Sequence, residues 1–74
     1  MDYKAFYEEV ANWINQCNQK AIKLGMHSND FWSWVMRSIG ELSDKYGNNE
    51  LVKMQMVMLV DWLNDIYERS KQNG

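Results

Sequence analysis

Two side chains in the sequence have the chemistry of a nucleophile, a general base or a soft metal ligand: the only cysteine, Cys17, and the only histidine, His27. A catalytic Cys–His pair needs hydrogen-bond reach, but Cys17 is expected two turns before the end of a helix and His27 in the turn that follows it. A zinc site needs three or four ligands, which these two residues cannot supply. We therefore expect no catalytic residue, and we interpret Cys17 as a small buried apolar residue.

The sequence also lacks the patterns of carboxylate metal sites and phosphate-binding loops. The carboxylates are spread over faces expected to be solvated, and no inward-facing Glu-x-x-His pair of a metal-binding bundle occurs. A glycine-rich phosphate loop is also missing. The prediction is a protein that is not an enzyme, with no metal, no cofactor and no small-molecule substrate.

The charge pattern argues against nucleic acid as a partner. The formal net charge is −2, and the eight basic residues are scattered rather than gathered into a patch. A helix-turn-helix-like arrangement could offer a DNA-reading face around Ser28 and Arg37. That face would contain a single cation with Asp30 and Glu41 nearby. A DNA-binding regulator therefore remains an alternative function rather than the main one.

The N-terminal residues and the apolar runs bear on location. The opening segment MDYKAFYEEV is acidic and amphipathic, which is not the pattern of a signal peptide. The longest apolar run, residues 56–60, is far too short to span a membrane. A single cysteine fits a reducing compartment, because it cannot form an internal disulfide. The expectation is a cytoplasmic protein with no membrane segment.

The elements that carry these residues are predicted to be long helices. The 74 residues include no proline and only four glycines, so few positions interrupt a helix. Helices are expected over residues 3–24, 29–46 and 49–70. Expected N-caps are Asp2 for the first, Ser28 or Asn29 for the second, and Asn48 or Asn49 for the third. Gly25 and Gly47 are expected just past helix ends.

Short connections make neighbouring helices antiparallel, so the predicted fold is an all-α, up-down-up three-helix bundle forming a single domain, residues 1–74. Each helix carries an apolar stripe at three- to four-residue spacing that should face the core. The predicted core stripes are Tyr3, Phe6, Tyr7, Val10, Trp13, Ile14, Cys17, Ala21 and Leu24; Phe31, Trp32, Val35, Met36, Ile39, Leu42 and Tyr46; and Val52, Met56, Leu59, Val60, Leu63, Ile66 and Tyr67. Gly40 lies inside the second helix and marks either a close helix–helix contact or a local weakness.

Five of the apolar residues outside these stripes form the candidate protein interface. Val57, on the polar side of the third helix, is an isolated apolar residue and is not part of it. On the third helix, Leu51, Met54, Met58 and Trp62 make a second arc, which could face a neighbouring helix or bind another molecule. On the second helix, Trp34 points away from the stripe. It could fold over the turn, lie across the stem of Arg37, or anchor an interface.

The predicted function follows from a preformed helical surface without catalytic groups. We expect a small protein–protein interaction module that forms a homodimer or binds another protein. Adaptor, inhibitor and accessory roles, in a bacterium or a phage, all fit this description. A purely structural, monomeric bundle is the remaining alternative, and it predicts that the second arc is fully buried.

Overall fold

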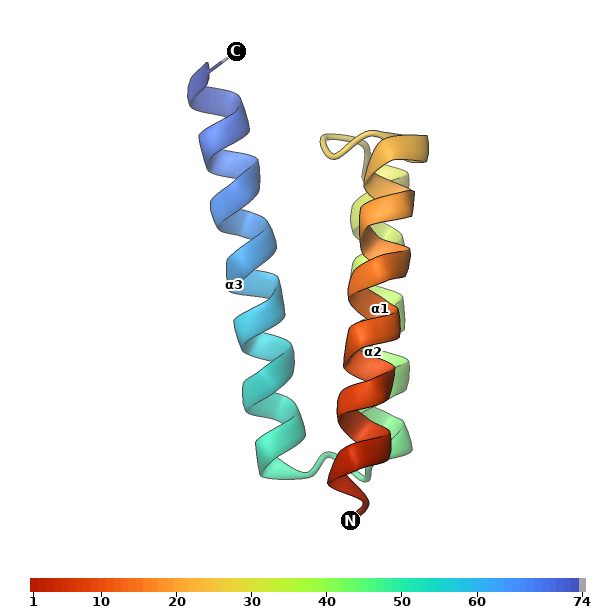
Figure 1. Ribbon diagram of the computed structural model, residues 1–74. Coiled ribbons are helices and arrows are strands. Elements are labelled where there is room, and N and C mark those ends of the chain that lie inside the picture. The colour runs from red at the N-terminus through yellow and green to blue at the C-terminus, as the bar shows by residue number, and fades with distance from the viewer. Residues whose placement is uncertain (74) are drawn as a thin grey trace. The chain divides into compact units, whose positions relative to one another are not determined.

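The computed structural model of the protein describes residues 1–73, and the side chains of residues 1–70. Three helices follow one another along the chain, α1 (Tyr3–Leu24), α2 (Asn29–Lys45) and α3 (Glu50–Asn73), joined by short turns (Figure 1). The described residues contain no strand. Consecutive helices contact one another, α1 with α2 and α2 with α3, so the predicted all-α three-helix fold is confirmed.

The first two helices begin at side-chain caps. The Asp2 carboxylate accepts a hydrogen bond from the backbone N–H of Ala5 at 3.0 Å, as the sequence predicts. At the start of α2 the cap is Ser28 rather than Asn29, because the Ser28 hydroxyl accepts from the N–H of Phe31 at 3.1 Å. The same hydroxyl donates to the carbonyl oxygen of Gly25 at 2.9 Å, which ties the turn to the helix it starts.

The turns reverse the chain through residues with positive φ. Gly25 has φ of 88° and ψ of 131°, a conformation that is essentially restricted to glycine. The second turn places Gly47 at φ 65° and Asn48 at φ 57°, and asparagine is among the residues that tolerate this region. Asn49, not Asn48, then caps α3, since its side-chain oxygen accepts from the N–H of Leu51 at 2.9 Å.

The chain groups into two compact units, Met1–Val35 and Met36–Gly74. The boundary falls inside α2, so the first unit holds α1 with the start of α2, and the second holds the rest of α2 with α3. The prediction of a single domain over residues 1–74 stays a prediction.

The buried apolar residues all come from the predicted stripes. They are Phe6, Val10, Trp13, Cys17, Phe31 and Val35 in the first unit, and Ile39, Leu42, Val52, Met56, Leu59 and Leu63 in the second. The stripes were drawn too wide, since Tyr3, Tyr7 and Met36 are exposed. Met36 follows the buried Val35 by one residue and is therefore turned about 100° from it around the helix. Its assignment to the core was wrong for that reason.

The structure decides the role of Gly40. This residue is exposed within α2, and a Cβ atom added to it would meet nothing within 4 Å. No close helix–helix approach therefore requires glycine at this position among the residues described. Gly40 is a local weakness of the helix, because glycine is less favourable than alanine in a helix interior.

Candidate functional site

The one thiol of the chain is placed where burial disfavours its reactive thiolate form. Cys17 lies in α1 with 1% of its surface exposed. Burial raises the pKa of the Cys17 thiol from 9.0 to about 11, because the thiolate would lose its hydration. A reactive cysteine needs the opposite shift, since the thiolate is the attacking species. His27 is exposed in the turn between α1 and α2.

The side chains that usually bind metal ions do not form a metal centre in the described part of the chain. No group of three or more His, Cys, Asp or Glu side chains there could hold a metal ion. Two apolar features on the described surface are built by α2 and α3.

Trp34, one of the five predicted interface residues, is packed within the first unit. Its ring stacks on that of Trp13 from α1, with centroids 5.5 Å apart and planes 15° from parallel. The ring of Phe31 lies 6.4 Å away at 27°. Trp34 is half-buried as a result, and it packs on α1 instead of folding over the turn or lying across Arg37. This stack gives Trp34 a structural role, and its role as an interface anchor stays a prediction.

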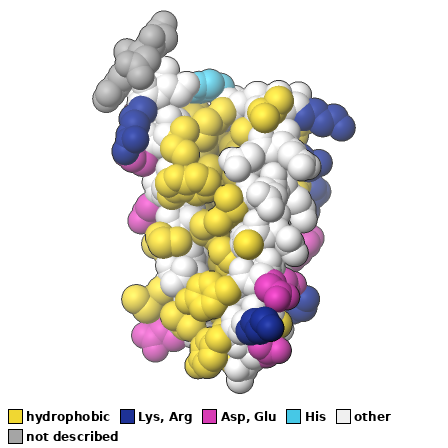
Figure 2. Space-filling view, viewed as in Figure 1, with side chains coloured by type: hydrophobic (Ala, Val, Ile, Leu, Met, Phe, Trp, Pro, Cys, Tyr) yellow, Lys and Arg dark blue, Asp and Glu magenta, His cyan; other side chains and the backbone are white. Residues whose placement is uncertain are grey.

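The other four predicted residues lie on one side of α3 and form what we call the α3 arc: Leu51, Met54, Met58 and Trp62. Exposed fractions are 64% for Met54, 51% for Met58 and 38% for Trp62, while Leu51 is half-buried. Full burial of this arc, which a purely structural bundle would require, is not observed. At 100° per residue the last three side chains span about 80° of the helix surface. Figure 2 shows hydrophobic and acidic side chains next to one another along α3, at the left of the view.

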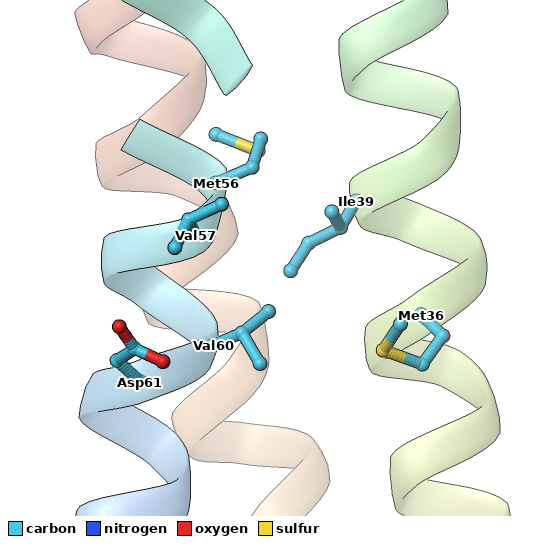
Figure 3. A pocket seen from close by; sticks show the side chains of 6 residues that line it. All are labelled: Met36, Ile39, Met56, Val57, Val60 and Asp61. Carbon is cyan, nitrogen blue, oxygen red and sulfur yellow. The ribbon is translucent and has the colours of Figure 1, made fainter. Parts of the chain in front are cut away.

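A second apolar feature, which sequence reasoning missed, lies between α2 and α3 within the second unit. It is an open groove with a volume of about 260 Å³. The residues that line it are Met36 and Ile39 from α2 and Met56, Val57, Val60 and Asp61 from α3. In the close-up the side chains of Ile39 and Val60 point toward one another, and the Asp61 carboxylate lies at the edge, directed away from α2 (Figure 3).

Two residues with misleading sequence signals form the rim of this α2–α3 groove. Met36 was assigned to the core and is 58% exposed, while Val57 was noted only as an isolated apolar residue among polar ones and is 59% exposed. An apolar residue on an otherwise polar helix face was the one available signal. The groove floor is formed by Ile39 and Met56, which are buried.

Asp61 is the one charged residue among those that line the groove. Neither Lys53, four residues before Val57, nor Glu68, seven residues after Asp61, lines the groove. The Asp61 carboxylate is exposed and makes no ion pair or hydrogen bond with any residue that the structure describes. The neighbouring carboxylate of Asp65 differs, because it is paired with the guanidinium of Arg69. The groove therefore combines an apolar floor with one carboxylate, that of Asp61, at its edge.

None of the three helices, as far as they are described, is long and apolar enough to cross a membrane. No protein-family model, curated protein or solved structure matches the chain.

Proposed function

We propose that this chain is a small, non-catalytic helical interaction module that associates with a second copy of itself through the α3 arc. The observation that carries the proposal is the exposure of Met54, Met58 and Trp62 on one side of a single helix. Contiguous exposed apolar patches on soluble proteins mark interaction sites more often than scattered single residues do. Methionine adapts to irregular partner surfaces, and tryptophan is enriched among the residues that dominate binding energy.

The spacing of the arc suits a symmetric pairing. Met54 and Trp62 lie four residues before and after Met58. Two α3 helices crossing antiparallel at Met58 would therefore bring Met54 of one copy against Trp62 of the other. A twofold arrangement of this kind buries the same patch on both copies, which is the commonest form of association among soluble oligomers.

In this role the protein would act by occupying a surface, as adaptors, inhibitors and accessory proteins do. Association with a different protein, instead of a second copy, would use the same residues of the α3 arc. A cytoplasmic setting agrees with the free, buried thiol of Cys17, because free thiols persist in reducing compartments.

Sedimentation equilibrium across a range of protein concentrations tests the proposal. The wild-type chain should show a mass that rises with concentration. Met58→Ala should weaken association by more than about 1 kcal/mol, which is roughly a fivefold rise in Kd. Ile22→Ala is the control, because Ile22 is an exposed apolar residue on α1 and lies outside the arc.

Two outcomes would count against self-association through the arc. A strictly monomeric mass at every concentration would remove the second copy as the partner. Equal weakening by Met58→Ala and Ile22→Ala would show association that does not depend on the arc. Circular dichroism of each variant at 222 nm verifies that the helices are intact.

A further inference from the structure

The sulfur atoms of this chain differ in exposure, and the α3 arc carries two of the three most exposed methionines. Met54 and Met58 are each more than half exposed, whereas Met56, between them in the sequence, is 3% exposed. The helix explains the difference, because Met54 and Met58 share one side of α3 and Met56 leaves the helix about 160° away from each. A small oxidant in solution therefore reaches Met54 and Met58 and is kept from Met56.

The one thiol does not compete for such an oxidant. A hydroperoxide oxidises cysteine through the thiolate, so the reaction follows thiolate character and exposure. Cys17 is 1% exposed, and burial raises the pKa of its thiol to about 11. A thioether has no proton to lose, and its sulfur lone pair is available at any pH. The accessible sulfur chemistry of the described chain is therefore that of its exposed methionines.

We propose that Met54 and Met58 form a peroxide-sensitive switch, in which oxidation of their thioethers to sulfoxides releases the second copy from the α3 arc. The inference rests on the proposed self-association and adds its regulation. The sulfur lone pair attacks one oxygen of hydrogen peroxide, the S–O bond forms and the O–O bond breaks. The departing hydroxide takes the proton of the transferred oxygen and leaves as water. The sulfur loses two electrons, and the peroxide gains them.

The change in polarity weakens the pairing. A sulfoxide is polar where the thioether was apolar, which disrupts methionine-rich interfaces, and burying a polar group without a hydrogen-bond donor is unfavourable. In a twofold pairing centred on Met58, each copy contributes Met54 and Met58, so complete oxidation places four sulfoxides in one interface. Methionine sulfoxide reductases restore the thioether, so the switch is reversible.

Access to the arc in the free chain, and its loss on association, give the first measurement. The full chain is treated with dilute hydrogen peroxide at several protein concentrations, and each methionine is followed by peptide mass spectrometry. At low concentration Met36, Met54 and Met58 should be oxidised well before Met56. At high concentration oxidation of Met54 and Met58 should slow, because the second copy covers them. Met36, which is exposed and lies outside the arc, should be oxidised at the same rate throughout.

Sedimentation equilibrium then compares the untreated and the oxidised chain. Oxidation should raise the Kd for self-association at least about tenfold. The double variant Met54→Leu/Met58→Leu keeps an apolar side chain of similar volume at both positions and forms no sulfoxide there. It should therefore associate equally before and after peroxide. Met36→Leu is the matched control and should lose association on oxidation as the wild-type chain does.

The switch and the self-association fail in different ways. An oxidised wild-type chain with an unchanged Kd would overturn the switch and leave self-association intact. Loss of association by the oxidised double variant would assign the effect to other methionines, and loss of the circular dichroism signal at 222 nm would assign it to unfolding; either result contradicts the switch. A chain that is monomeric before treatment, or oxidation of Met54 and Met58 that ignores protein concentration, would remove self-association through the arc and the switch with it.

Discussion

Replacing Gly40 with alanine should stabilise the protein. Gly40 lies in the interior of α2 and is exposed, and an added Cβ would contact no atom within 4 Å. The methyl group therefore meets no clash and gains little burial. What remains is the difference in helix propensity, which favours alanine over glycine by about 0.8–1.0 kcal/mol because glycine loses more backbone freedom on folding.

The expected magnitude is thus an increase of about 1 kcal/mol in the free energy of unfolding. For a domain of 60–100 residues this corresponds to a rise in Tm of about 4–8 °C. Thermal and urea unfolding followed by circular dichroism at 222 nm measure the change, at a protein concentration where the chain sediments as a monomer. The denaturant slope should stay at its wild-type value, since the substitution leaves the buried surface unaltered.

Gly25→Ala is the matched control, with the opposite sign. A Cβ at Gly25 also has nothing within 4 Å, so the two glycines differ in backbone conformation rather than in available space. Gly25 has φ of 88°, and a non-glycine residue held there costs about 1–3 kcal/mol. A lower Tm for Gly40→Ala would refute this reasoning, because it would require a close approach of another helix to residue 40.

Two further outcomes are expected from the first unit. The Cys17 thiol should resist alkylation in the folded protein at pH 8 and react on unfolding. Folding raises its pKa from 9.0 to about 11, so the unfolded chain loses the thiol proton at a lower pH than the folded chain does. The free energy of unfolding should therefore decline from about pH 9 to 11 more steeply than in Cys17→Ala. Rapid alkylation of the native protein would contradict its burial. Trp34→Ala should lower the free energy of unfolding by about 2 kcal/mol, since it removes the stack on Trp13 together with apolar burial. In the same urea unfolding series, Met54→Ala at an exposed site should change it by less than about 0.5 kcal/mol. An equally small loss for Trp34→Ala would show that the stack adds little.

Local features of the sequence were enough to predict the secondary structure and the core. Helix caps depend on residues within three positions of one another, as the bonds from Ala5 to Asp2 and from Phe31 to Ser28 show. The apolar period of a helix is equally local, so the predicted stripes contain every buried apolar residue of the described chain. The only uncertainty in the caps was between adjacent residues, such as Asn48 and Asn49, which backbone conformation decided.

The exposure of the residues at the edges of the stripes depended on tertiary structure. Periodicity gives the direction in which a side chain leaves its helix, but not whether a neighbouring helix covers that direction. Trp34 was expected to point away from the core stripe of its helix and instead stacks on Trp13, which is 21 positions earlier in the chain. Met36 and Val57 were assigned to a core stripe and a polar face, and together they form the rim of one groove.

The candidate site divides in the same way. The sequence by itself determined that Met54, Met58 and Trp62 share one side of α3, because a spacing of four residues brings side chains nearly into line on any helix. Only the tertiary structure decided that these three stay exposed and that a groove opens between α2 and α3. The reason is that exposure and hollows are set by how two helices approach each other, and residues far apart in the sequence determine that approach.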